Sequence, residues 1–523
     1  MIEAEVHLSL HNFLRSQAGF PSWPHHLTMA RLVARALRLG RSALIQVGAV
    51  SGYQGRYRTS FVASALMWHG PVIIVAPEEV QQRLLRVEIP RLQQWLQANK
   101  PIRTGDAWPS AEFQGLLLTS PAAWLRGQFT SSGDFPPDIP TIIDGVDDLE
   151  DWVRHQLTQD IQPHDWDQLM LACPNQAEAI RSARVQLTKE LFQHPVNPYE
   201  CYLISQPEIE ILNHLYSALE SVKGLPEPWQ RFWQQFEYIN NENSSPAPFT
   251  PPPLFWATIA HRQGLFSLHY APIELGKILS PIWQRQPVVL IGSVLESETE
   301  APLLRQRFGL DDVTCLKFSS ESQAEAIQLY LPHKLPLPNT PEFQAAFIHK
   351  VRTLLCLSAT APGLTVILVG DVPLKAQVGT ILASEFGSRV QVEKTCLDEN
   401  GILVSGWEFW REHQSVLPAP HLLVIATLPL PSLENPLVAG RVAHYKRSHQ
   451  DWFRLYLLPT ALNELQRAIA PVRGENQGII ALLDSRVVNR SYGAQILAAL
   501  SPLARINYLD PSLFSNANEE NSA

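Results

Sequence analysis

Long hydrophobic runs are absent from this sequence. Its longest apolar stretches, PVIIVAP at 71–77 and LLVIATLPLP at 422–431, fall well short of the roughly 20 residues that a membrane-spanning helix needs. The first residues, MIEAEVHLSL, also lack the basic segment and apolar stretch of a secretory signal. We therefore expect a cytoplasmic protein that has no membrane partner and whose apolar runs form buried strands.

Cysteine is scarce as well, and positive charge is not in excess. The five cysteines, at 173, 201, 315, 356 and 396, include no CxxC pair. This spacing is typical of buried thiols in a reducing compartment and speaks against a disulfide scaffold. A net charge of −9 gives no general attraction to phosphate. Any binding of nucleic acid would therefore depend on a local basic groove.

Apolar runs of four to seven residues recur along the chain and alternate with helical patterns. This alternation predicts parallel sheets that are covered by helices on both faces. The first series is ALIQV (43–47), PVIIVA (71–76), GLLLTS (115–120) and PTIIDG (140–145); the second is VVLIG (288–292), LTVILVG (364–370), GILVSG (401–406), LLVIAT (422–427) and GIIALLD (478–484). Since single cores rarely exceed about 250–300 residues, 523 residues and two series predict an α/β fold with two lobes.

The segment between the two series has a different composition. Residues 151–239 are rich in Gln, Trp, Leu and Glu without strand-like alternation, which predicts a helical insertion. The stretch NNENSSPAPFTPPP (240–253) predicts a linker, because proline lacks an amide hydrogen and fixes its backbone angle. We expect lobe 1 over 1–318 with an insertion over about 151–283, lobe 2 over 319–511, and a disordered tail over 512–523.

Two places in the first series carry residues that suit a nucleotide site. VGAVSG (47–52) leaves a predicted strand and precedes a helix, where glycines let backbone amides approach a phosphate. IIDGVDD (142–148) places Asp144 at a strand end, where a nucleotide-hydrolysing fold holds magnesium. Alone, the first is equally an ordinary strand-to-helix turn and the second an ordinary helix cap.

The order of several such pieces resembles the DinG/XPD-like branch of the superfamily 2 DNA helicases over almost the whole chain. The most specific stretches are GILVSGWEFW (401–410), LLVIATLPLPSLENPLVAGRV (422–442) and the segment 455–500, which resemble the second helicase lobe. LPLPNTPEFQAAF (335–347) resembles the opening of that lobe. VGAVSGYQ (47–54), IIDGVD (142–147) and VLIGSVL (289–295) fall at the Walker A loop, the Walker B box and a motif that couples hydrolysis to DNA movement.

This resemblance implies two RecA-like parallel-sheet lobes of the P-loop NTPase helicase fold. It also implies ATP-dependent DNA unwinding, with ATP and Mg²⁺ as cofactors and single-stranded or forked DNA as partner. The residues that it assigns to the nucleotide are Gly48, Ser51, Gly52, Tyr53, Gln54, Arg56, Arg58 and Thr59. Those that it assigns to catalysis are Asp144, Asp147, Gln466 and Arg473, with Asp144 also as the magnesium ligand.

The Walker A loop departs from the family pattern. Laid on Gly-Thr-Gly-Thr-Gly-Lys-Thr, the chain keeps Gly48 and Gly52 but has Tyr53 at the lysine and Gln54 at the threonine. The charge that meets the phosphates and the hydroxyl that binds magnesium are both missing. Loss of the lysine alone would weaken phosphate binding by roughly ten- to a hundredfold. Arg56, Arg58 and Thr59 would substitute only in a reshaped loop.

Two further catalytic positions are altered. The glutamate after Asp144 is replaced by Gly145, and loss of a general base costs about 10²–10⁴ in rate. In motif VI, Gln466 and Arg473 keep the family spacing, but Ala470 stands at the first arginine. An arginine finger contributes on the order of 10³–10⁵. The sequence therefore predicts that ATP hydrolysis is impaired or lost.

Many family members hold an iron–sulfur cluster with four cysteines between the Walker A and Walker B motifs. This chain has no cysteine between residues 53 and 143. Because thiolates are the ligands of such a cluster, we expect none here.

The segment RVAHYKRSHQDWFR (441–454) carries the candidate nucleic-acid contacts Arg441, Lys446 and Arg447. Aromatic rings near positive charge suit single-stranded nucleic acid, where stacking contributes about 1–3 kcal/mol per base. Packing of these rings against the second lobe explains the same pattern.

Three hypotheses follow from the sequence. The first is a helicase-fold protein that binds single-stranded or forked DNA between its lobes without effective ATP hydrolysis. The second is an active ATP-dependent helicase that uses a divergent phosphate loop around Arg56–Thr59. The third is a scaffold that keeps the fold in order to bind a protein partner.

Overall fold

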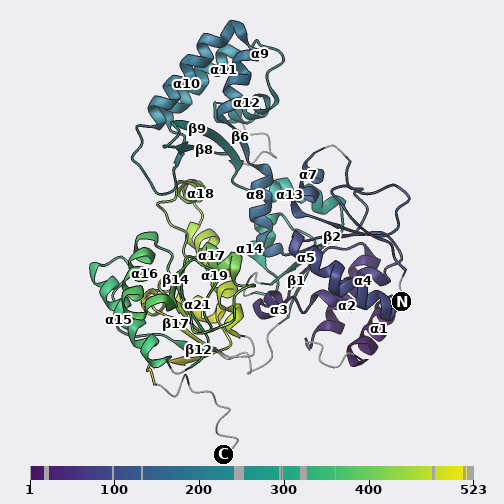
Figure 1. Ribbon diagram of the computed structural model, residues 1–523. Helices are drawn as coiled ribbons and strands as arrows, with labels where there is room; N and C mark the ends of the chain where they lie inside the picture. Colours follow the sequence, from purple (N-terminus) through teal and green to yellow (C-terminus); the bar gives the residue numbers. More distant parts are fainter. Residues whose placement is uncertain are drawn as a thin grey trace, which may run out of the picture.

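The computed structural model describes residues 2–16, 23–96, 99–130, 133–240, 253–293, 296, 298–318, 327–359, 361–473, 478–510 and 514. Figure 1 shows two α/β lobes with a third body standing above them. The predicted linker, residues 241–252 above all, lies outside the described residues, as does most of the predicted tail.

Lobe 1 is built on a seven-stranded parallel sheet. Its strand order is β11-β1-β10-β5-β2-β4-β3. The strands are β1 (Ala43–Gln46), β2 (Val72–Val75), β3 (Ile102–Thr104), β4 (Leu116–Thr119), β5 (Thr141–Asp144), β10 (Val288–Gly292) and β11 (Thr314–Lys317). The five inner strands, such as VIIV in β2, are buried along their whole length, because helices cover both faces.

The helices of lobe 1 lie in two layers that enclose separate apolar cores, one on each face of the sheet. The helical elements are α1 (Ile2–Ser16), α2 (His26–Leu39), α3 (Ala49–Gln54), α4 (Arg58–Met67), α5 (Glu78–Arg83), η1 (Leu84–Glu88), α6 (Ile89–Leu96), α7 (Pro121–Phe129), η2 (Val146–Asp148), α8 (Leu149–Leu157), α13 (Gly276–Arg285) and α14 (Pro302–Phe308). β10, predicted in the second series, pairs with β1 and β5 and so belongs to lobe 1.

The insertion is a separate body of helices and strands between α8 and α13. Its helices are α9 (Pro163–Ala172), η3 (Pro174–Gln176), α10 (Ala177–Leu191), α11 (Gln206–Leu219) and α12 (Glu227–Asn240). They pack on a four-stranded antiparallel sheet, ordered β6-β9-β8-β7, of β6 (Gln159–Ile161), β7 (Cys201–Leu203), β8 (Pro253–Ala260) and β9 (Leu265–Pro272).

The predicted helical insertion is present, and it also contains a small antiparallel sheet that was not predicted. β6 and β7 are three residues long, too short to show alternation in the sequence, and they form strands because they pair with β9 and β8. The predicted bounds of about 151–283 were too wide. α8 and α13 pack on the sheet of lobe 1, since Val153 and Leu279 are buried in its core.

Lobe 2 repeats the architecture of lobe 1. Its sheet is parallel in the order β14-β15-β13-β16-β17-β12-β18. The strands are β12 (Ile327–Tyr330), β13 (Leu364–Leu368), β14 (Val390–Val392), β15 (Ile402–Ser405), β16 (Pro420–Ile425), β17 (Ile479–Leu482) and β18 (Leu503–Ile506). Together the two sheets confirm the predicted pair of RecA-like lobes.

The helical elements of lobe 2 are α15 (Pro341–Leu357), α16 (Val372–Phe386), η5 (Gly387–Arg389), α17 (Trp407–His413), α18 (Pro436–Arg447), η6 (Phe453–Leu457), α19 (Leu458–Ile469), η7 (Ala470–Arg473), α20 (Arg486–Asn489) and α21 (Gly493–Ala499). Phe514 is buried in one of the two cores of this lobe. The disordered tail over 512–523 stays a prediction, because its other residues lie outside those that the structure describes.

The two lobes and the insertion touch one another. α3 of lobe 1 packs against α19 and η7 of lobe 2, while α18 of lobe 2 packs against β7 and β8 of the insertion. Gly440 in α18 permits this second contact, because a Cβ there would lie 2.5 Å from Leu254. Within the described ranges, no helix has the length and apolar character that spanning a membrane requires.

Candidate functional site

The candidate nucleotide site lies where three neighbouring strands of lobe 1 end. β10 lies between β1 and β5, with Gln46 opposite Gly292 and Ile291 opposite Asp144. All three strands are parallel, so the residues that follow them gather at one edge of the sheet. Ligands of open α/β sheets bind at this edge.

The chain after β1 folds into a short helix where a phosphate-binding loop would curve around a phosphate. Gly48 adopts φ 85°, which only glycine takes at low cost, and α3 begins at the next residue. The amide of Gly52 donates to the carbonyl of Gly48 at 2.9 Å and so is used within the helix. A Cβ on Gly52 would lie 1.9 Å from the Cβ of Ser293, so α3 lies directly on the end of β10.

Asp144, at the end of β5, is bound on both carboxylate oxygens by lobe 1 itself. The Tyr57 hydroxyl donates to Oδ1, and Arg58 Nε donates to Oδ2 at 2.8 Å. Asp144 is 1% exposed, and the Arg58 side chain is 13% exposed. A guanidinium therefore supplies, from within the chain, the positive charge that a buried carboxylate requires.

Burial and this ion pair set the pKa values of Tyr57 and Arg58. Burial, and next the charge of Asp144, raises the pKa of Tyr57 well above its ordinary value. Burial lowers the pKa of Arg58, but the neighbouring Asp144 outweighs it, so the pKa lies above its ordinary value. Tyr57 and Arg58 thus keep the protons that they donate to Asp144.

Gly145 stands at the position of the family's general base and adopts a backbone conformation that suits glycine. Its φ is 104°, where a side chain is strained. A Cβ there would lie 3.0 Å from the ring of Trp152 in α8. The local fold therefore has no room for a glutamate in its present conformation.

Tyr53, at the position of the family's lysine, reaches lobe 2. Its hydroxyl donates to the backbone carbonyl of Gln414, just after α17, at 3.0 Å. Together with the packing of α3 against η7, this bond joins the two lobes beside the end of β1. Burial raises the pKa of Tyr53, which keeps the hydroxyl protonated.

Asp147 and Asp148 extend this contact. The backbone amide of Ser293 donates to Asp147 Oδ2 at 2.7 Å, which ties the chain after β5 to the end of β10. Arg467 of α19 donates to Asp148 Oδ1 at 2.6 Å, across the two lobes. Burial raises the pKa of Asp147, and the positive charge of Arg467 works against it.

The two remaining motif VI residues lie within lobe 2. Gln466 Nε2 donates to the carbonyl of Ala499 at 3.0 Å. Arg473 is buried, and its guanidinium donates to the carbonyls of Leu500 and Pro502. Both side chains therefore bond to the end of α21 and the turn after it. The fold does not bring these two predicted catalytic residues to Asp144.

The other predicted nucleotide residues are divided between helix and core. Ser51 and Gln54 lie half-buried in α3, and Arg56 lies half-buried in the turn that follows. Thr59 is buried in α4, where its hydroxyl donates to Glu88 at 3.3 Å. Gly48, Gly52, Tyr53 and Arg58 lie close to Asp144 or to the facing lobe.

These residues do not fit a magnesium–nucleotide complex in the present arrangement. Both oxygens of Asp144 are engaged by Tyr57 and Arg58, and Gly145 has no base. Across the part of the chain that the structure describes, no group of three or more His, Cys, Asp or Glu side chains is arranged to hold a metal ion. The expected lack of an iron–sulfur cluster stays a prediction.

Comparison with known sequences points to the second lobe. A family profile described as the helicase C-terminal domain matches residues 419–503. The ATP-dependent DNA helicase YoaA of Escherichia coli (strain K12) is 30% identical over 108 residues, which are 20% of this chain and 17% of the relative. YoaA of Haemophilus influenzae is 23% identical over 138 residues, 26% of this chain and 22% of the relative. The matches thus span under a quarter of these relatives.

Comparison with solved structures extends the likeness to the whole fold. Xpd4 of S. tokodaii superposes with a TM-score of 0.57 and 12% identity, over 92% of this chain and all of that chain. An XPD helicase superposes with a TM-score of 0.54 and 12% identity, over 93% and 100%. Residues 419–503 are therefore similar to the C-terminal domain of helicases, and the fold as a whole is similar to that of XPD. At this identity the structures establish the fold alone, and the matches to the relatives cover at most 26% of this chain.

The predicted nucleic-acid residues of this chain differ in their surroundings. Arg441 is directed inward: its Nη1 donates to the Tyr456 hydroxyl at 3.3 Å and lies 3.9 Å from Glu150 of lobe 1. Lys446 and Arg447, at the end of α18, are exposed. The Lys446 ammonium lies 5.2 Å from the ring centroid of Trp452.

A groove on lobe 2 was missed in the sequence. We name it the lobe 2 basic groove; it is a cavity of about 510 Å³ lined by Phe453, Arg454, Arg486, Arg490 and Tyr492, with Asn339, Ser491 and Gln495. The rings of Phe453 and Tyr492 lie 4.9 Å apart. Arg486 is held by both oxygens of Asp484, whereas Arg454 and Arg490 are exposed.

The residues that sequence reasoning missed meet only through the fold. Tyr57 is adjacent to the predicted Arg58, yet nothing in the order of residues indicates that it reaches Asp144. Arg467 is adjacent to Gln466, and its partner Asp148 lies in the other lobe. The groove residues come from η6, α20, the turn after α20 and α21, with Asn339 from the segment before α15. For Tyr57 and Arg467 the sequence offered one signal, which is that each is adjacent to a predicted site residue. Adjacency does not show where a side chain points in the folded protein.

Proposed function

We propose that this DinG/XPD-like protein binds single-stranded or forked DNA and does not turn over ATP at a useful rate. The pairing of Asp144 with Arg58 and Tyr57 is the observation that carries this proposal. In the family, magnesium brings positive charge to this carboxylate. Here a guanidinium on the same lobe brings it, so nucleotide binding would first have to break a buried ion pair.

Three further features support the loss of hydrolysis. Tyr53 replaces a cation and is bonded to Gln414, Gly145 replaces the base, and Ala470 replaces an arginine. The base and the arginine each contribute a factor of about 10² to 10⁵ to phosphate chemistry, and the lysine strengthens phosphate binding roughly ten- to a hundredfold. No neighbouring group at Asp144 supplies a comparable role in the arrangement described above.

The test of this part is ATPase activity with and without single-stranded DNA, with an active DinG-family helicase as positive control. We expect no DNA-stimulated release of phosphate above the blank. Robust stimulated turnover would overturn the proposal and favour an active helicase with a divergent loop. In that case Arg56→Ala and Arg58→Ala would each abolish nucleotide binding.

The lobe 2 basic groove supports the DNA-binding part. Single strands bind to grooves that combine positive charge along the backbone with aromatic rings on which bases stack. Phe453 and Tyr492 offer such rings, and Arg454 and Arg490 offer exposed guanidinium groups. Trp452, whose ring lies 6.1 Å from that of Phe453, and Lys446 continue the pattern toward α18.

The test of this part is fluorescence anisotropy with a labelled oligothymidylate at low salt, where phosphate contacts are strongest. We expect the wild type to bind the oligonucleotide and Arg454→Ala/Arg490→Ala to bind it more weakly. The slope of the logarithm of the binding constant against the logarithm of the salt concentration should fall by about one unit for each lost phosphate contact. Arg35→Ala, an exposed arginine of α2, is the matched control. A folded protein that binds no oligonucleotide would favour the scaffold hypothesis.

A further inference from the structure

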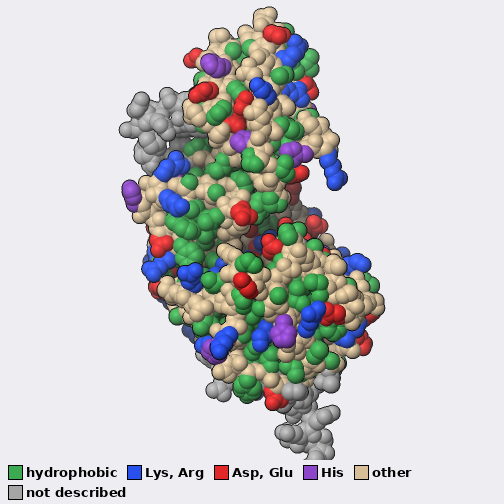
Figure 2. Space-filling model, turned by 90° about the vertical axis from the view of Figure 1, so that its left-hand side faces the viewer, with side chains coloured by type: hydrophobic (Ala, Val, Ile, Leu, Met, Phe, Trp, Pro, Cys, Tyr) green, Lys and Arg blue, Asp and Glu red, His purple; other side chains and the backbone are tan. Residues whose placement is uncertain are grey.

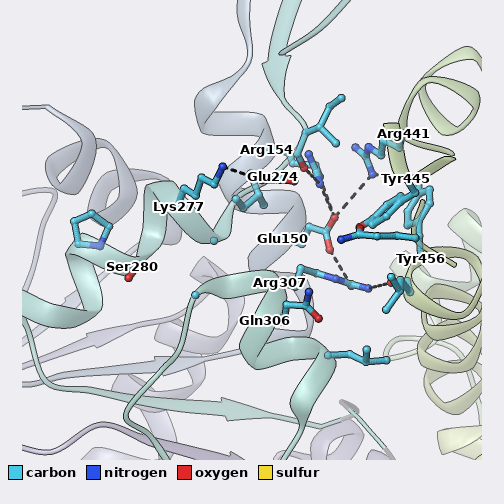
Figure 3. Close-up of a pocket in the computed structure, with 18 of the residues that line it drawn as sticks. Glu150, Arg154, Glu274, Lys277, Ser280, Gln306, Arg307, Arg441, Tyr445 and Tyr456 are labelled. Carbon is cyan, nitrogen blue, oxygen red and sulfur yellow. Dashed lines mark hydrogen bonds and ion pairs between the residues drawn. The ribbon is translucent and has the colours of Figure 1, made fainter. Parts of the chain in front are cut away.

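A second cavity, of about 500 Å³, lies where lobe 1, the base of the insertion and α18–η6 of lobe 2 meet. α8, α13 and α14 supply one side, and α18 and η6 supply the other (Figure 3). In Figure 2 the surface is hollowed between the upper and lower parts of the molecule, with hydrophobic side chains gathered beside the hollow. This volume is in the range of sites for small organic molecules.

The cavity holds an excess of positive charge. Its lining contains four cations, Arg154, Lys277, Arg307 and Arg441, against two carboxylates, Glu150 and Glu274, which leaves a formal charge of +2. The three arginines of this set surround Glu150, as Figure 3 shows. Burial raises the pKa of Glu150, but the arginines outweigh it and hold the pKa at about 2, so its charge is constant near neutral pH.

Two of the arginines around Glu150 are well bonded. Arg154 donates to Glu150 at 3.0 Å and to the carbonyls of Pro272 and Ile273. Arg307 donates to Glu150 at 3.0 Å and to the carbonyl of Leu455 at 3.0 Å. These two guanidinium groups take up the oxygens of Glu150 and tie the three parts of the molecule together.

Arg441 is held less well. It lies 3.9 Å from Glu150 and 3.3 Å from the Tyr456 hydroxyl, and its Nε is buried without a hydrogen-bond partner. An acceptor from outside the chain cannot reach this buried Nε, but it can reach the exposed part of a guanidinium that makes one hydrogen bond at 3.3 Å and one ion pair at 3.9 Å. The side chain is 22% exposed, which leaves room for that acceptor on the cavity side.

The rest of the lining is largely apolar. Ile273, Leu275, Leu303 and Leu455 line the cavity, and the ring of Tyr445 stands beside Arg441. A bare inorganic ion would leave these apolar surfaces in contact with water. A ligand with an apolar body would bury them, which contributes about 25 cal/mol of binding free energy for each Å². The lining therefore matches a molecule with an anionic group and an apolar body.

We propose that this cavity binds a small organic anion, whose acidic group lies against Arg441 and whose apolar body lies against the leucine side chains. Since residues of lobe 1, the base of the insertion and lobe 2 all line the cavity, the bound molecule bridges them and favours their present arrangement. This proposal is independent of ATP hydrolysis and of the lobe 2 basic groove. Arg441, predicted as a nucleic-acid contact, acts here as the anion ligand.

Two dyes of one shape test the proposal with the full chain. Anilinonaphthalene sulfonate carries the anionic group, and N-phenyl-1-naphthylamine is its neutral counterpart. We expect the sulfonate to bind with a stoichiometry near one, and Arg441→Met to weaken it about tenfold or more, the factor for one charge-assisted hydrogen bond. The neutral dye should bind wild type and Arg441→Met alike.

Controls separate the site from general dye binding. Arg35→Met removes an equal charge from exposed α2 and should leave both dyes unaffected. Arg441→Lys keeps the charge, so its affinity for the sulfonate should lie close to that of the wild type. This variant covers the case in which Arg441→Met does not fold. An equal effect of Arg441→Met on the two dyes, or of Arg35→Met and Arg441→Met on the sulfonate, would overturn the proposal.

An oligonucleotide competitor distinguishes the two sources of an anionic group. We expect an excess of oligothymidylate to leave the bound sulfonate in place. Displacement by oligothymidylate in wild type, but not after Arg454→Ala/Arg490→Ala, would assign the cavity to the path of a DNA strand and overturn the small-molecule proposal.

Discussion

Two carboxylates of lobe 1, the buried Asp144 and the half-buried Glu150, lie six residues apart in the sequence and differ in the charges around them. Asp144 meets one guanidinium and one hydroxyl of its own lobe, so its charge is balanced locally. Glu150 meets three arginines from α8, α14 and α18, which leaves cationic charge beside a cavity. Lobe 1 thus pairs the charge of Asp144 internally and leaves an excess of positive charge around Glu150.

The largest effect is expected at Glu150. Glu150→Ala leaves three guanidinium groups facing one another without their carboxylate, and breaking a buried charge cluster costs about 3–5 kcal/mol. We expect a clear fall in the temperature of the first thermal transition, because this cluster joins the lobes. Glu274→Ala, at a half-exposed carboxylate of the same cavity, is the control and should change the transition little.

Acid should reproduce part of this loss in the wild type. The native pKa of Glu150 is held at about 2, below its ordinary value of 4.5, so its charge stabilises the folded state. This contribution is complete above about pH 4.5 and is lost as the pH falls toward 2. The free energy of chemical unfolding should therefore fall more between pH 5 and pH 3 in the wild type than in Glu150→Gln.

The next effect is expected at Arg58. Arg58→Ala leaves Asp144 buried and without its cation, which should lower the stability of lobe 1 by about 3 kcal/mol. If Arg58 stands in for magnesium, millimolar Mg²⁺ should restore part of the lost melting temperature in the variant and none in the wild type. Arg56→Ala, at the half-buried neighbour, should show neither change. Failure of Mg²⁺ to act on Arg58→Ala would remove the idea of a guanidinium in place of a metal.

A smaller effect is expected at Gly145. Gly145→Ala places a Cβ at φ 104° and 3.0 Å from Trp152, so we expect a loss of about 1–2 kcal/mol. Gly224 has φ 85° with nothing within 4 Å of an added Cβ, and Gly224→Ala therefore measures the cost of the backbone alone. The difference between the two melting curves isolates the contact with Trp152, and equal losses would contradict it.

The smallest effect is expected at Tyr53. Tyr53→Phe removes one hydrogen bond to Gln414 between the lobes and keeps the ring, which should cost about 1 kcal/mol. Faster limited proteolysis between the lobes would report it. Tyr199→Phe, at a more exposed tyrosine of the insertion, is the control and should leave the cleavage rate unchanged. An equal increase of the cleavage rate in the two variants would show that the effect does not come from the contact between the lobes.

Much of the architecture could be predicted from the sequence, because buried parallel strands read as continuous apolar runs. The runs in β2, β4, β13 and β16 indicated the two sheets without any contact information. Short strands such as β6 and β7 escaped prediction, since three residues have no readable period. They are strands because β8 and β9 offer them hydrogen-bond partners.

The candidate site divides in the same way. The order of residues by itself determined that Tyr53, Gly145 and Ala470 replace a cation, a base and an arginine, because chemical type is a local property. Only the tertiary structure decided that Arg58 neutralises Asp144, that Arg473 is turned into lobe 2, and that Arg441 faces a cavity. Partners of a charge come from distant segments, and the energy of burying it depends on where the folded chain places them.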